Sequence, residues 1–339
     1  MDPRYSRQTR FSGIGEDGQH RLGQALALIV GCGALGTHLA ETLVRAGVGR
    51  VRIVDRDVVE ETNLQRQSIF DERDARDGIP KALAAQRRLR EVNSHVTIEA
   101  IAADFTNKNA EELATGIDVI VDATDNFETR FLINDVAIKL GLPWVYAACL
   151  GSTSMVMPVI PGETACFACL IEEMPPAGGD TCDTAGVIMP AVMISSAIAG
   201  AEALKLLAGR RAELIRKVQV HDCWSGHHAA LDASKPRDGC PVCLGRSFAY
   251  LSGRMSQQAV SLCGRNTVQI TPQTKLRRPL ADVAAGLSGA ATVLDCHPFL
   301  LRVEARGKRI SLFPDGRALV SGTSDLGEAR SLYAQLIGS

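Results

Sequence analysis

The chain has 339 residues, which is enough for one large domain and a smaller one. It contains 37 Lys and Arg against 38 Asp and Glu, so bulk electrostatics indicate neither a nucleic-acid partner nor a membrane partner. The charge is unevenly placed, because the residues from Phe248 onward hold 11 Lys and Arg against 6 Asp and Glu, and the preceding part holds 26 against 32.

The first ten residues are polar and include Arg4, Arg7 and Arg10. They contain no apolar stretch followed by a small-residue cleavage site, so we expect no secretion signal and a cytoplasmic location. The chain has ten cysteines. In a reducing compartment such cysteines favour metal or thiol chemistry over disulfides.

The first part of the chain alternates two patterns. Continuous apolar runs predict strands and the stretches between them predict helices: strands over Ala25–Val30, Val51–Val54 and Ile117–Val121, and helices over Ala34–Ala46, Lys81–Val92 and Phe127–Leu140. This alternation predicts a Rossmann-like, doubly wound α/β fold with a mostly parallel sheet covered on both faces. Active sites in such sheets lie beyond the C-terminal ends of the strands.

The pattern becomes irregular and rich in Pro and Gly from Pro158 to Gly186, which predicts a long functional loop. The next segment, Val187–Ala208, is nearly all apolar. It contains Glu202 and Lys205, which favour a buried core helix over a membrane span.

Two domains are expected, over residues 1–247 and 248–339. The second is predicted to be a small α/β domain of unknown role. Its expected elements are strands near Val268 and over Phe299–Val303, Arg309–Phe313 and Ala318–Val320, and helices near Leu280 and over Leu326–Leu336.

A glycine-rich turn follows the first strand and opens a helix, with the sequence Gly31-Cys32-Gly33-Ala34-Leu35-Gly36. Glycines permit a tight turn and close approach of phosphate, and a helix N-terminus supplies free N–H groups. Asp55 ends the next strand, 19 residues after Gly36, where a carboxylate can accept hydrogen bonds from ribose hydroxyls. This pattern alone fits a nicotinamide-dependent oxidoreductase as well as other nucleotide enzymes.

Further polar side chains follow at the same predicted edge of the sheet. Asp57 and the segment Asn63-Leu64-Gln65-Arg66-Gln67 come after Asp55, Pro80-Lys81 opens the next helix, and Asp122-Ala123-Thr124-Asp125-Asn126 ends another strand. A nucleotidyl transfer needs cations that stabilise phosphoryl charge and a carboxylate that holds magnesium, whereas a dehydrogenase does not. Each residue alone is typical of a solvated surface, but together they indicate phosphate chemistry.

The chain resembles the MoeB/ThiF-type adenylyltransferases, which are related to the ubiquitin-activating enzymes. The resemblance covers residues 4–246. The residues that carry it are Arg4-Tyr5-Ser6-Arg7-Gln8, Gly31 to Gly36, Asp55-Arg56-Asp57-Val58-Val59, Asn63 to Gln67, Pro80-Lys81-Ala82, Thr124-Asp125-Asn126 and two Cys-x-x-Cys pairs.

The resemblance implies a homodimer that binds ATP on the glycine turn with its ribose on Asp55. It implies that Asp125 coordinates Mg²⁺ and that Arg7 reaches the site of the other subunit. The nucleotide-binding residues implied are Gly31, Gly33, Ala34, Gly36, Asp55, Asp57, Asn63, Arg66, Gln67, Lys81, Asp125 and Asn126. The catalytic residues implied are Arg7, Arg66, Lys81, Asp125 and Cys182.

The implied reaction is attack by the C-terminal Gly-Gly carboxylate of a small ubiquitin-like sulfur-carrier protein on the α-phosphate of ATP, which releases pyrophosphate. Adenylation gives a poor acylating group a good leaving group, and it needs mainly positioning and charge stabilisation. A sulfur donor would act next. Delivery to thiamine, molybdopterin, cysteine or tRNA stays open.

Three alternatives to this function stay open at the level of the sequence. One is a nicotinamide-dependent oxidoreductase, which the glycine turn and Asp55 would serve equally well. A second is an adenylating enzyme that acts on a tRNA base or a short peptide. A third is a catalytically silent scaffold for ubiquitin-like proteins, against which Arg7, Arg66, Lys81 and Asp125 argue.

Two cysteine pairs, Cys166-x-x-Cys169 and Cys240-x-x-Cys243, have the spacing of a tetrahedral zinc site. Four protein ligands leave no open position, so the predicted role of Zn²⁺ is structural, tying the irregular loop to the end of the core domain. Free thiols and a redox pair are the alternatives.

Cys182 aligns with a cysteine that can bond covalently to the carrier in enzymes of this type. Asp180 and Asp183 beside it would raise its thiol pKa, which argues against a reactive thiolate, so a covalent and an inert role both stay open. The tail resembles a small extension found on some bacterial members. Its positive balance suggests that it docks an acidic carrier, and a structural or dimer-stabilising module is the alternative.

Overall fold

The structure is a computed structural model that describes residues 2–172, 174, 185–255, 259–262, 266–270, 272, 276, 278–287, 289–298 and 300–338. The chain forms two compact units, Met1–Met255 and Ser256–Ser339. The larger unit contains the glycine turn and both cysteine pairs.

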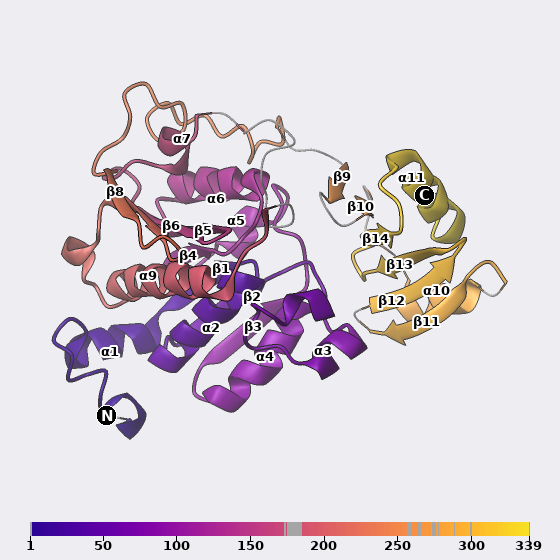
Figure 1. Ribbon diagram of the computed structural model, residues 1–339, viewed down its shortest axis with the longest axis horizontal. Coiled ribbons are helices and arrows are strands. Elements are labelled where there is room, and N and C mark those ends of the chain that lie inside the picture. The colour runs from indigo at the N-terminus through magenta and orange to yellow at the C-terminus, as the bar shows by residue number, and fades with distance from the viewer. Residues whose placement is uncertain are drawn as a thin grey trace. The chain divides into compact units, whose positions relative to one another are not determined.

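An eight-stranded sheet runs through the larger unit in the order β3-β2-β1-β4-β5-β6-β7-β8 (Figure 1). Five strands are parallel, namely β1 (Leu26–Val30), β2 (Arg50–Val54), β3 (Thr97–Ile101), β4 (Val119–Asp122) and β5 (Trp144–Leu150). Three strands extend the sheet antiparallel, namely β6 (Thr153–Val159), β7 (Lys217–Asp222) and β8 (His228–Asp232). The predicted mostly parallel α/β fold is therefore confirmed.

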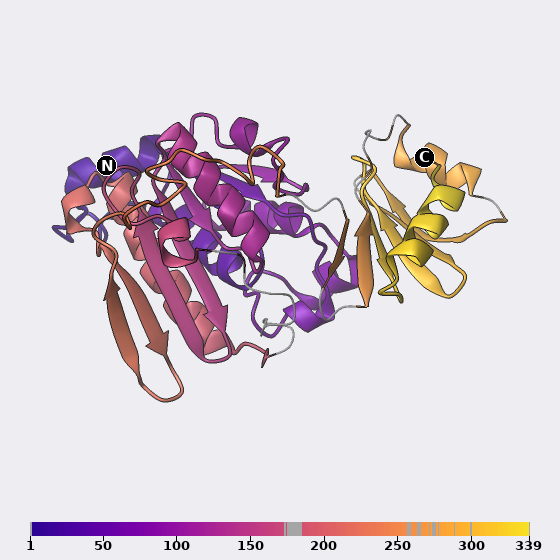
Figure 2. The same cartoon turned by 90° about the horizontal axis from the view of Figure 1, so that it is seen from above.

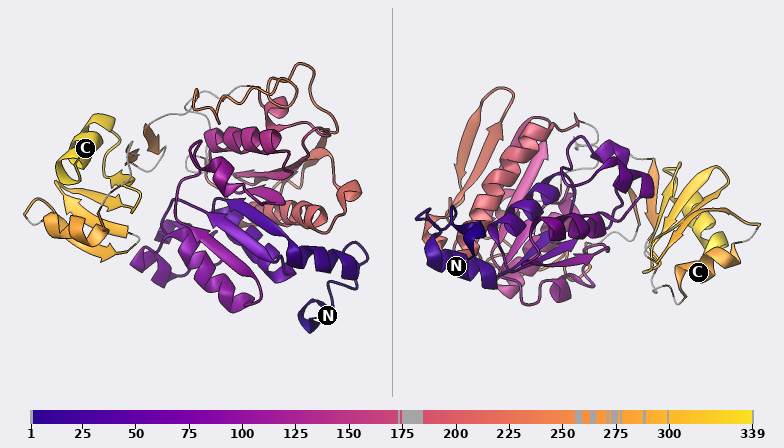
Figure 3. Two further views of the ribbon diagram at one scale, coloured as in Figure 1. Left: turned by 180° about the vertical axis from the view of Figure 1, so that it is seen from behind. Right: turned by 90° about the horizontal axis from the view of Figure 1, so that it is seen from below.

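Helices cover both faces of this sheet, as Figures 1 and 3 show. Strand β1 is buried throughout: Ala27 and Ile29 belong to one core, and Leu26, Leu28 and Val30 to the other. The first core includes α1 (Gly15–Gln24), α2 (Ala34–Ala46), α4 (Lys81–Val92) and α9 (Met189–Leu207), and the second includes α5 (Ala110–Leu113), α6 (Phe127–Leu140) and α7 (Phe167–Leu170). The short elements are η1 (Pro3–Tyr5), η2 (Glu61–Asn63), α3 (Glu72–Asp77) and η3 (Arg211–Glu213).

The helices α2, α4 and α6 have the predicted bounds. Gly47 ends α2 with a φ of 78°, and Gly141 ends α6 with a φ of 71°, so both stops use the left-handed conformation that glycine adopts without strain. At the start of α6, the side-chain oxygen of Asn126 accepts a hydrogen bond from the Thr129 N–H at 2.8 Å.

The apolar segment after residue 186 forms α9, which packs on β5, β6 and α2. Within the described part of the chain, α9 is the one helix whose length and apolar composition would allow it to cross a membrane. Half of its most apolar 18-residue stretch is buried inside the protein. Its buried Glu202 accepts hydrogen bonds from the Lys205 ammonium at 2.7 Å and from the Ile215 N–H at 3.0 Å. These partners compensate the cost of a carboxylate in the core.

The smaller unit contains a six-stranded antiparallel sheet in the order β11-β12-β13-β14-β10-β9 (Figure 2). Its strands are β9 (Ala259–Leu262), β10 (Thr267–Ile270), β11 (Thr292–His297), β12 (Leu300–Ala305), β13 (Lys308–Leu312) and β14 (Ala318–Ser321). The helices α10 (Leu280–Gly286) and α11 (Leu326–Leu336) share one core with this sheet. The predicted bounds of the closing helix are confirmed.

The order of the parallel strands creates a switch point beside β1. From β1 the chain adds β2 and β3 on one side, then crosses to add β4 and β5 on the other. Helices therefore diverge beyond the carboxyl ends of β1 and β4, where ligands bind in open α/β sheets. The residues at those two strand ends are Gly31 and Ala123.

Candidate active site

The glycine turn lies at this switch point and is packed against the end of β4. Gly31 has a φ of 94°, its N–H donates to the Val54 carbonyl at 2.8 Å, and a Cβ there would lie 2.6 Å from the Ala123 carbonyl oxygen. A Cβ on Gly36 would overlap the Gly31 carbonyl oxygen. Gly33 caps α2 without a side-chain hydrogen bond, so the first turn of α2 is suited to binding an anion.

Asp55, directly after β2, is fixed next to the turn by backbone hydrogen bonds. Its carboxylate accepts the Cys32 N–H at 2.5 Å and the Asp57 N–H at 2.6 Å. Burial raises the pKa of Asp55, while the nearby Lys81 ammonium and these two N–H groups oppose the rise. A carboxylate has about four acceptor positions, so Asp55 retains capacity for ribose hydroxyls.

Lys81 is the first residue of α4, and its side chain is almost fully buried. Its Nζ lies 3.6 Å from the Asp57 Oδ2, and its backbone N–H donates to the Asp57 carbonyl at 2.9 Å. A buried ammonium needs such a partner. Lys81 also lowers the pKa of Asp55 and of the Cys32 thiol against the effect of burial, so the cation lies near the glycine turn.

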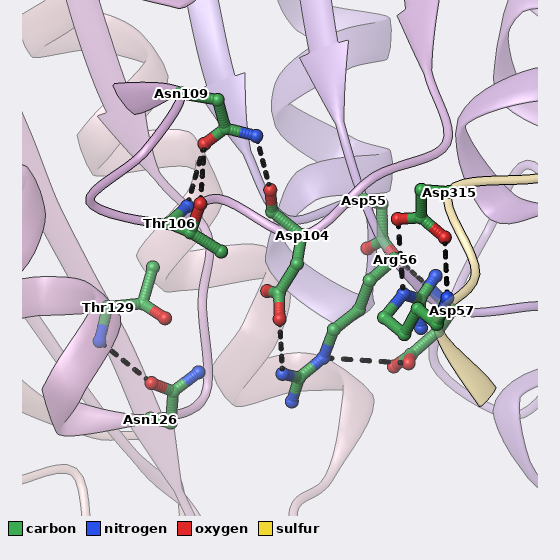
Figure 4. A network of polar contacts seen from close by, with 10 residues as sticks. Asp55, Arg56, Asp57, Asp104, Thr106, Asn109, Asn126, Thr129 and Asp315 are labelled. Atoms are coloured by element: carbon green, nitrogen blue, oxygen red, sulfur yellow. Dashed lines mark hydrogen bonds and ion pairs between the residues drawn. The ribbon is translucent and has the colours of Figure 1, made fainter. Parts of the chain in front are cut away.

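Arg56, in the loop after β2, is linked to the loop after β3 (Figure 4). Its guanidinium lies 3.3 Å from the Asp104 Oδ2 and 3.8 Å from the Asp57 Oδ1. Burial lowers the pKa of Arg56. The nearby carboxylates Asp104, Asp57 and Asp125 raise it by more, so the net shift is upward. Arg56 and Asp104 are not among the site residues predicted from the sequence, although a cation between the two carboxylates Asp55 and Asp57 is a signal for Arg56.

The loop from Asn63 to Gln67 contains three predicted phosphate ligands with different surroundings. Asn63 is buried, and its side-chain oxygen accepts the Glu60 N–H at 3.1 Å, whereas Arg66 is half-buried and donates to the Thr62 carbonyl at 2.9 Å. Gln67 is 3% exposed, and its Nε2 lies 3.8 Å from the position of a Cβ on Gly33. Its buried Oε1 has no hydrogen-bond partner among the described residues. Gln67 therefore contacts the turn, whereas Asn63 and Arg66 contact their own loop.

The turn between β4 and α6 is held by a buried ion pair. Asp122 accepts hydrogen bonds from the Thr124 N–H at 2.9 Å and the Thr124 hydroxyl at 2.7 Å. Arg130 donates to the Thr124 carbonyl at 2.7 Å, and its Nε lies 3.5 Å from the Asp122 Oδ2. Burial raises the pKa of Asp122 to about 6, with Arg130 opposing the rise. This fixed turn leaves Asp125 exposed and within electrostatic reach of Arg56.

Arg7 is exposed, and its neighbours Tyr5 and Gln8 contact the C-terminal end of α2, at the edge of the sheet opposite the glycine turn. The neighbouring Tyr5 packs over Gly47, at the end of α2, and its hydroxyl accepts the Asn93 side-chain N–H at 2.8 Å, at the end of α4. The length of α2, about 20 Å, separates this edge from the turn. Within one chain, Arg7 does not join the other predicted residues. Cys182 lies outside the described residues.

The four predicted metal ligands come together between α7 and the segment around residue 240. All four Sγ atoms lie within 4.8 Å of one another: Cys166 is 3.8 Å from Cys169 and 3.7 Å from Cys240, and Cys169 is 3.5 Å from Cys243. A tetrahedron with Zn–S bonds of about 2.3 Å has S···S edges of about 3.8 Å. The cluster therefore fits zinc.

Two N–H groups contact these sulfur atoms. The Asn134 amide lies 3.7 Å from the Cys166 Sγ, and the Arg237 N–H lies 3.3 Å from the Cys169 Sγ. Such hydrogen bonds orient and stabilise thiolate ligands. With four protein ligands the centre is closed, which suits a structural ion and not a catalytic one.

The fold and the site together define a nucleotide-binding α/β protein with phosphate chemistry at a helix N-terminus and a four-cysteine centre. The ThiF family model matches residues 5–242, and the chain belongs to the ThiF family. A relative from Bacillus subtilis named "Sulfur carrier protein ThiS adenylyltransferase" is 44% identical over 339 residues, covering 100% of both chains.

Two further comparisons concern a second relative and a solved structure. A Thermus thermophilus relative named "Sulfur carrier protein adenylyltransferase" is 41% identical over 249 residues, covering 71% of this chain and 90% of that protein. The crystal structure of E. coli MccB with MccA-N7isoASN superposes with a TM-score of 0.63 at 21% identity, covering 72% of this chain and 74% of that one. The structural likeness shows a shared fold.

Proposed function

We propose that this chain uses ATP and Mg²⁺ to adenylate the C-terminal Gly-Gly carboxylate of a small ubiquitin-like sulfur-carrier protein. The observation that carries the proposal is the convergence of Asp55, Lys81 and Gln67 on a glycine turn at the switch point of the sheet. The name of the full-length B. subtilis relative supports the same substrate class.

In this proposal the triphosphate lies against the first turn of α2, whose N–H groups and dipole favour anions. Lys81 stabilises negative charge that develops on the α-phosphate, and Asp57, 3.6 Å from its Nζ, holds it there. Asp125 would hold Mg²⁺, which supplies positive charge next to the phosphate oxygens. The buried Gln67 oxygen lacks a donor, which a hydroxyl or amino group of the nucleotide, and not a phosphate oxygen, would supply.

The chemistry is an in-line displacement at phosphorus. A carboxylate oxygen of the carrier forms a bond to the α-phosphorus, and the bond from that phosphorus to the bridging oxygen of pyrophosphate breaks. The product is an acyl-adenylate whose AMP is a good leaving group for sulfur from a donor. Because no covalent enzyme intermediate is required at this step, positioning and charge stabilisation suffice.

A homodimer is part of the proposal, because Arg7 is about one length of α2 away from the glycine turn of its own chain. A second copy would bring its Arg7 to that turn. The outer face of α9 suits such a contact: Met193 is 51% exposed, and Ala197 and Ala201, four and eight residues further on, are exposed as well. We therefore place the dimer contact on the outer face of α9.

The remaining expectations complete the proposal. Zn²⁺ on Cys166, Cys169, Cys240 and Cys243 would be structural, and the enzyme would work in the cytoplasm with neither a nucleic-acid nor a membrane partner. A separate sulfur donor would convert the adenylate to a thiocarboxylate. Cys182 would be the residue to examine for a covalent bond to the carrier.

The deciding experiment is ATP–pyrophosphate exchange with purified candidate carriers that end in Gly-Gly, using the same carriers without the last glycine as controls. Exchange that requires ATP, Mg²⁺ and the intact C-terminus is the expected result. If exchange required a tRNA or a short peptide and no carrier protein supported it, the substrate would be that tRNA or peptide instead of a carrier protein. Tight binding of NAD without binding of ATP would instead support the oxidoreductase.

A further inference from the structure

Residues 2–14 form an N-terminal arm that lies outside the two hydrophobic cores until Ile14. None of the three residues of η1 is buried. Between the arm and the body is an open cavity of about 580 Å³, so the two do not pack closely there; its lining includes Asp2, Tyr5, Glu16, Asp17, His20 and His95. Few apolar contacts therefore hold the arm, and segments of this kind open locally at low cost in free energy.

Point contacts fix the arm on both sides of Arg7. Before it, Tyr5 packs over Gly47 and accepts a hydrogen bond from Asn93. After it, the Gln8 amide donates to the Gln19 side chain at 2.7 Å and to the Ala46 carbonyl at 2.9 Å. The Arg7 side chain between these two points is exposed.

Arg210 fixes the base of the arm. Its Nε donates to the Gly13 carbonyl at 2.9 Å, and its Nη2 lies 3.5 Å from the carbonyl oxygens of both Ser12 and Ile14. A planar guanidinium can hold three consecutive carbonyls in a way that an ammonium cannot. Because Arg210 is three residues beyond the end of α9, it connects the arm to the helix on which we place the dimer contact.

We propose that Arg210 is a positioning residue for the adenylation site of the other subunit, acting through the arm that carries Arg7. The inference rests on the proposed function, because the site that receives Arg7 belongs to a second copy. Arg210 holds the base of the arm against the end of α9, so the arm leaves the dimer contact in a fixed direction. Loss of this clamp leaves the other subunit without a correctly placed Arg7.

Single substitutions give the first test. Arg210→Ala should lower carrier-dependent pyrophosphate exchange about 10- to 100-fold, as expected when a charged group is misplaced. Arg210→Lys should retain only part of the activity. Arg211→Ala is the matched control, because Arg211 contacts Glu163 at 2.8 Å and not the arm. It should stay within about twofold of the wild type, the range of a near-neutral surface change.

Mixed dimers test the direction in which Arg210 acts. Two variants are co-expressed with different affinity tags and purified through both tags, and exchange is then measured. Arg7→Ala with Lys81→Ala should recover one working site, because one chain supplies Lys81 and the other Arg7. Arg210→Ala with Lys81→Ala should recover activity in the same way. Arg210→Ala with Arg7→Ala should not, since both chains then have a defective arm.

The opposite pattern would overturn the inference. If Arg210 acts within its own subunit, its variant is rescued by Arg7→Ala and not by Lys81→Ala. Absence of rescue in the reference pair, Arg7→Ala with Lys81→Ala, would reject the shared site of the proposed function and the role of Arg210 with it. Trypsin gives an independent readout: cleavage after Arg7 and Arg10 should be faster in Arg210→Ala than in Arg211→Ala, and equal rates would contradict the clamp.

Discussion

Individual residues of the glycine turn differ in how much space surrounds them. A Cβ on Gly36 would overlap the Gly31 carbonyl oxygen, which is backbone and cannot move aside. A Cβ on Gly33 would meet only the Gln67 amide, at 3.8 Å, and the φ of Gly33, −87°, lies outside the left-handed region. Gly36 is therefore required by the close approach of the backbone, whereas the Gly33 site has room for a Cβ.

We expect Gly36→Ala to destabilise the fold by about 2 kcal/mol, since the added methyl group forces the backbone of the turn apart. Gly33→Ala should change the unfolding free energy by less than about 0.5 kcal/mol. Urea denaturation of both variants measures the difference. Equal losses would show that the close approach of Gly36 and Gly31 does not decide the stability of the turn.

Asp125 is exposed, so we expect its removal to leave the fold intact. If it holds Mg²⁺ as proposed, Asp125→Ala should abolish pyrophosphate exchange while the protein stays folded and loaded with zinc. Asp77→Ala serves as control, because Asp77 is another partly exposed carboxylate, paired with Arg73 at 3.8 Å on α3. Retained exchange in Asp125→Ala would remove this residue from the mechanism.

The ends of several helices are marked in the sequence, whereas some strands are not. The helices α2, α4, α6 and α11 were predicted with their observed bounds, because glycine, proline, Asp or Asn marks their ends. Strand β3 was missed because it follows a helix closely and is only partly buried. Strand β11 was missed as well, since it is mostly exposed at the edge of its sheet.

Part of the candidate site can be predicted from the sequence, and part of it requires the fold. Residues at strand ends and helix starts, such as Asp55 and Lys81, can be placed from the pattern alone, because parallel strands end at one edge. The contact of Arg56 with Asp104 was not predictable, because it depends on β3. The location of Arg7 at the far edge also required the fold, since no periodicity reports which end of α2 the arm contacts.

Helix α6 carries a titratable contact with the segment after the cysteine centre. The buried Asp135 carboxylate accepts the N–H groups of Tyr250 at 2.9 Å and Leu251 at 3.1 Å. Burial raises the pKa of Asp135 from 3.8 to about 6, with both N–H groups opposing the rise. The folded state therefore binds this proton more tightly than the unfolded state, so the contribution of Asp135 to stability declines as pH rises from about 4 through 6.

Asp135→Asn keeps the acceptor oxygen and removes the titration. The unfolding free energy of the wild type minus that of Asp135→Asn should fall by up to about 3 kcal/mol between pH 4 and pH 7. Urea denaturation at a series of pH values measures this difference. A difference that stays constant with pH would contradict the raised pKa.

The whole molecule consists of two units with separate cores. The core of the smaller unit is built from its own strands and helices, with Val268, Val303, Ile310 and Leu332 among its buried residues. The larger unit has two cores that contain no residue beyond Leu251 among their buried members. Each unit therefore has the burial that independent folding requires.

Deleting residues 256–339 should leave a folded larger unit that retains zinc. If the smaller unit docks an acidic carrier through its excess of positive charge, the deletion weakens carrier affinity, and the loss is greater at low salt than at high salt. Titration calorimetry at two salt concentrations measures this. Unchanged affinity would discard the docking role and favour a structural one.

The four-cysteine centre joins two parts of the chain that are far apart in sequence, Cys166–Cys169 and Cys240–Cys243. An ion held there closes a loop containing α9, β7 and β8, as a disulfide would, and such closure limits the conformations open to the unfolded chain. Unlike a disulfide, this cross-link persists in a reducing environment. A backbone cut within the loop would leave both fragments bonded to one metal, and a chelator, not a reductant, would remove that cross-link.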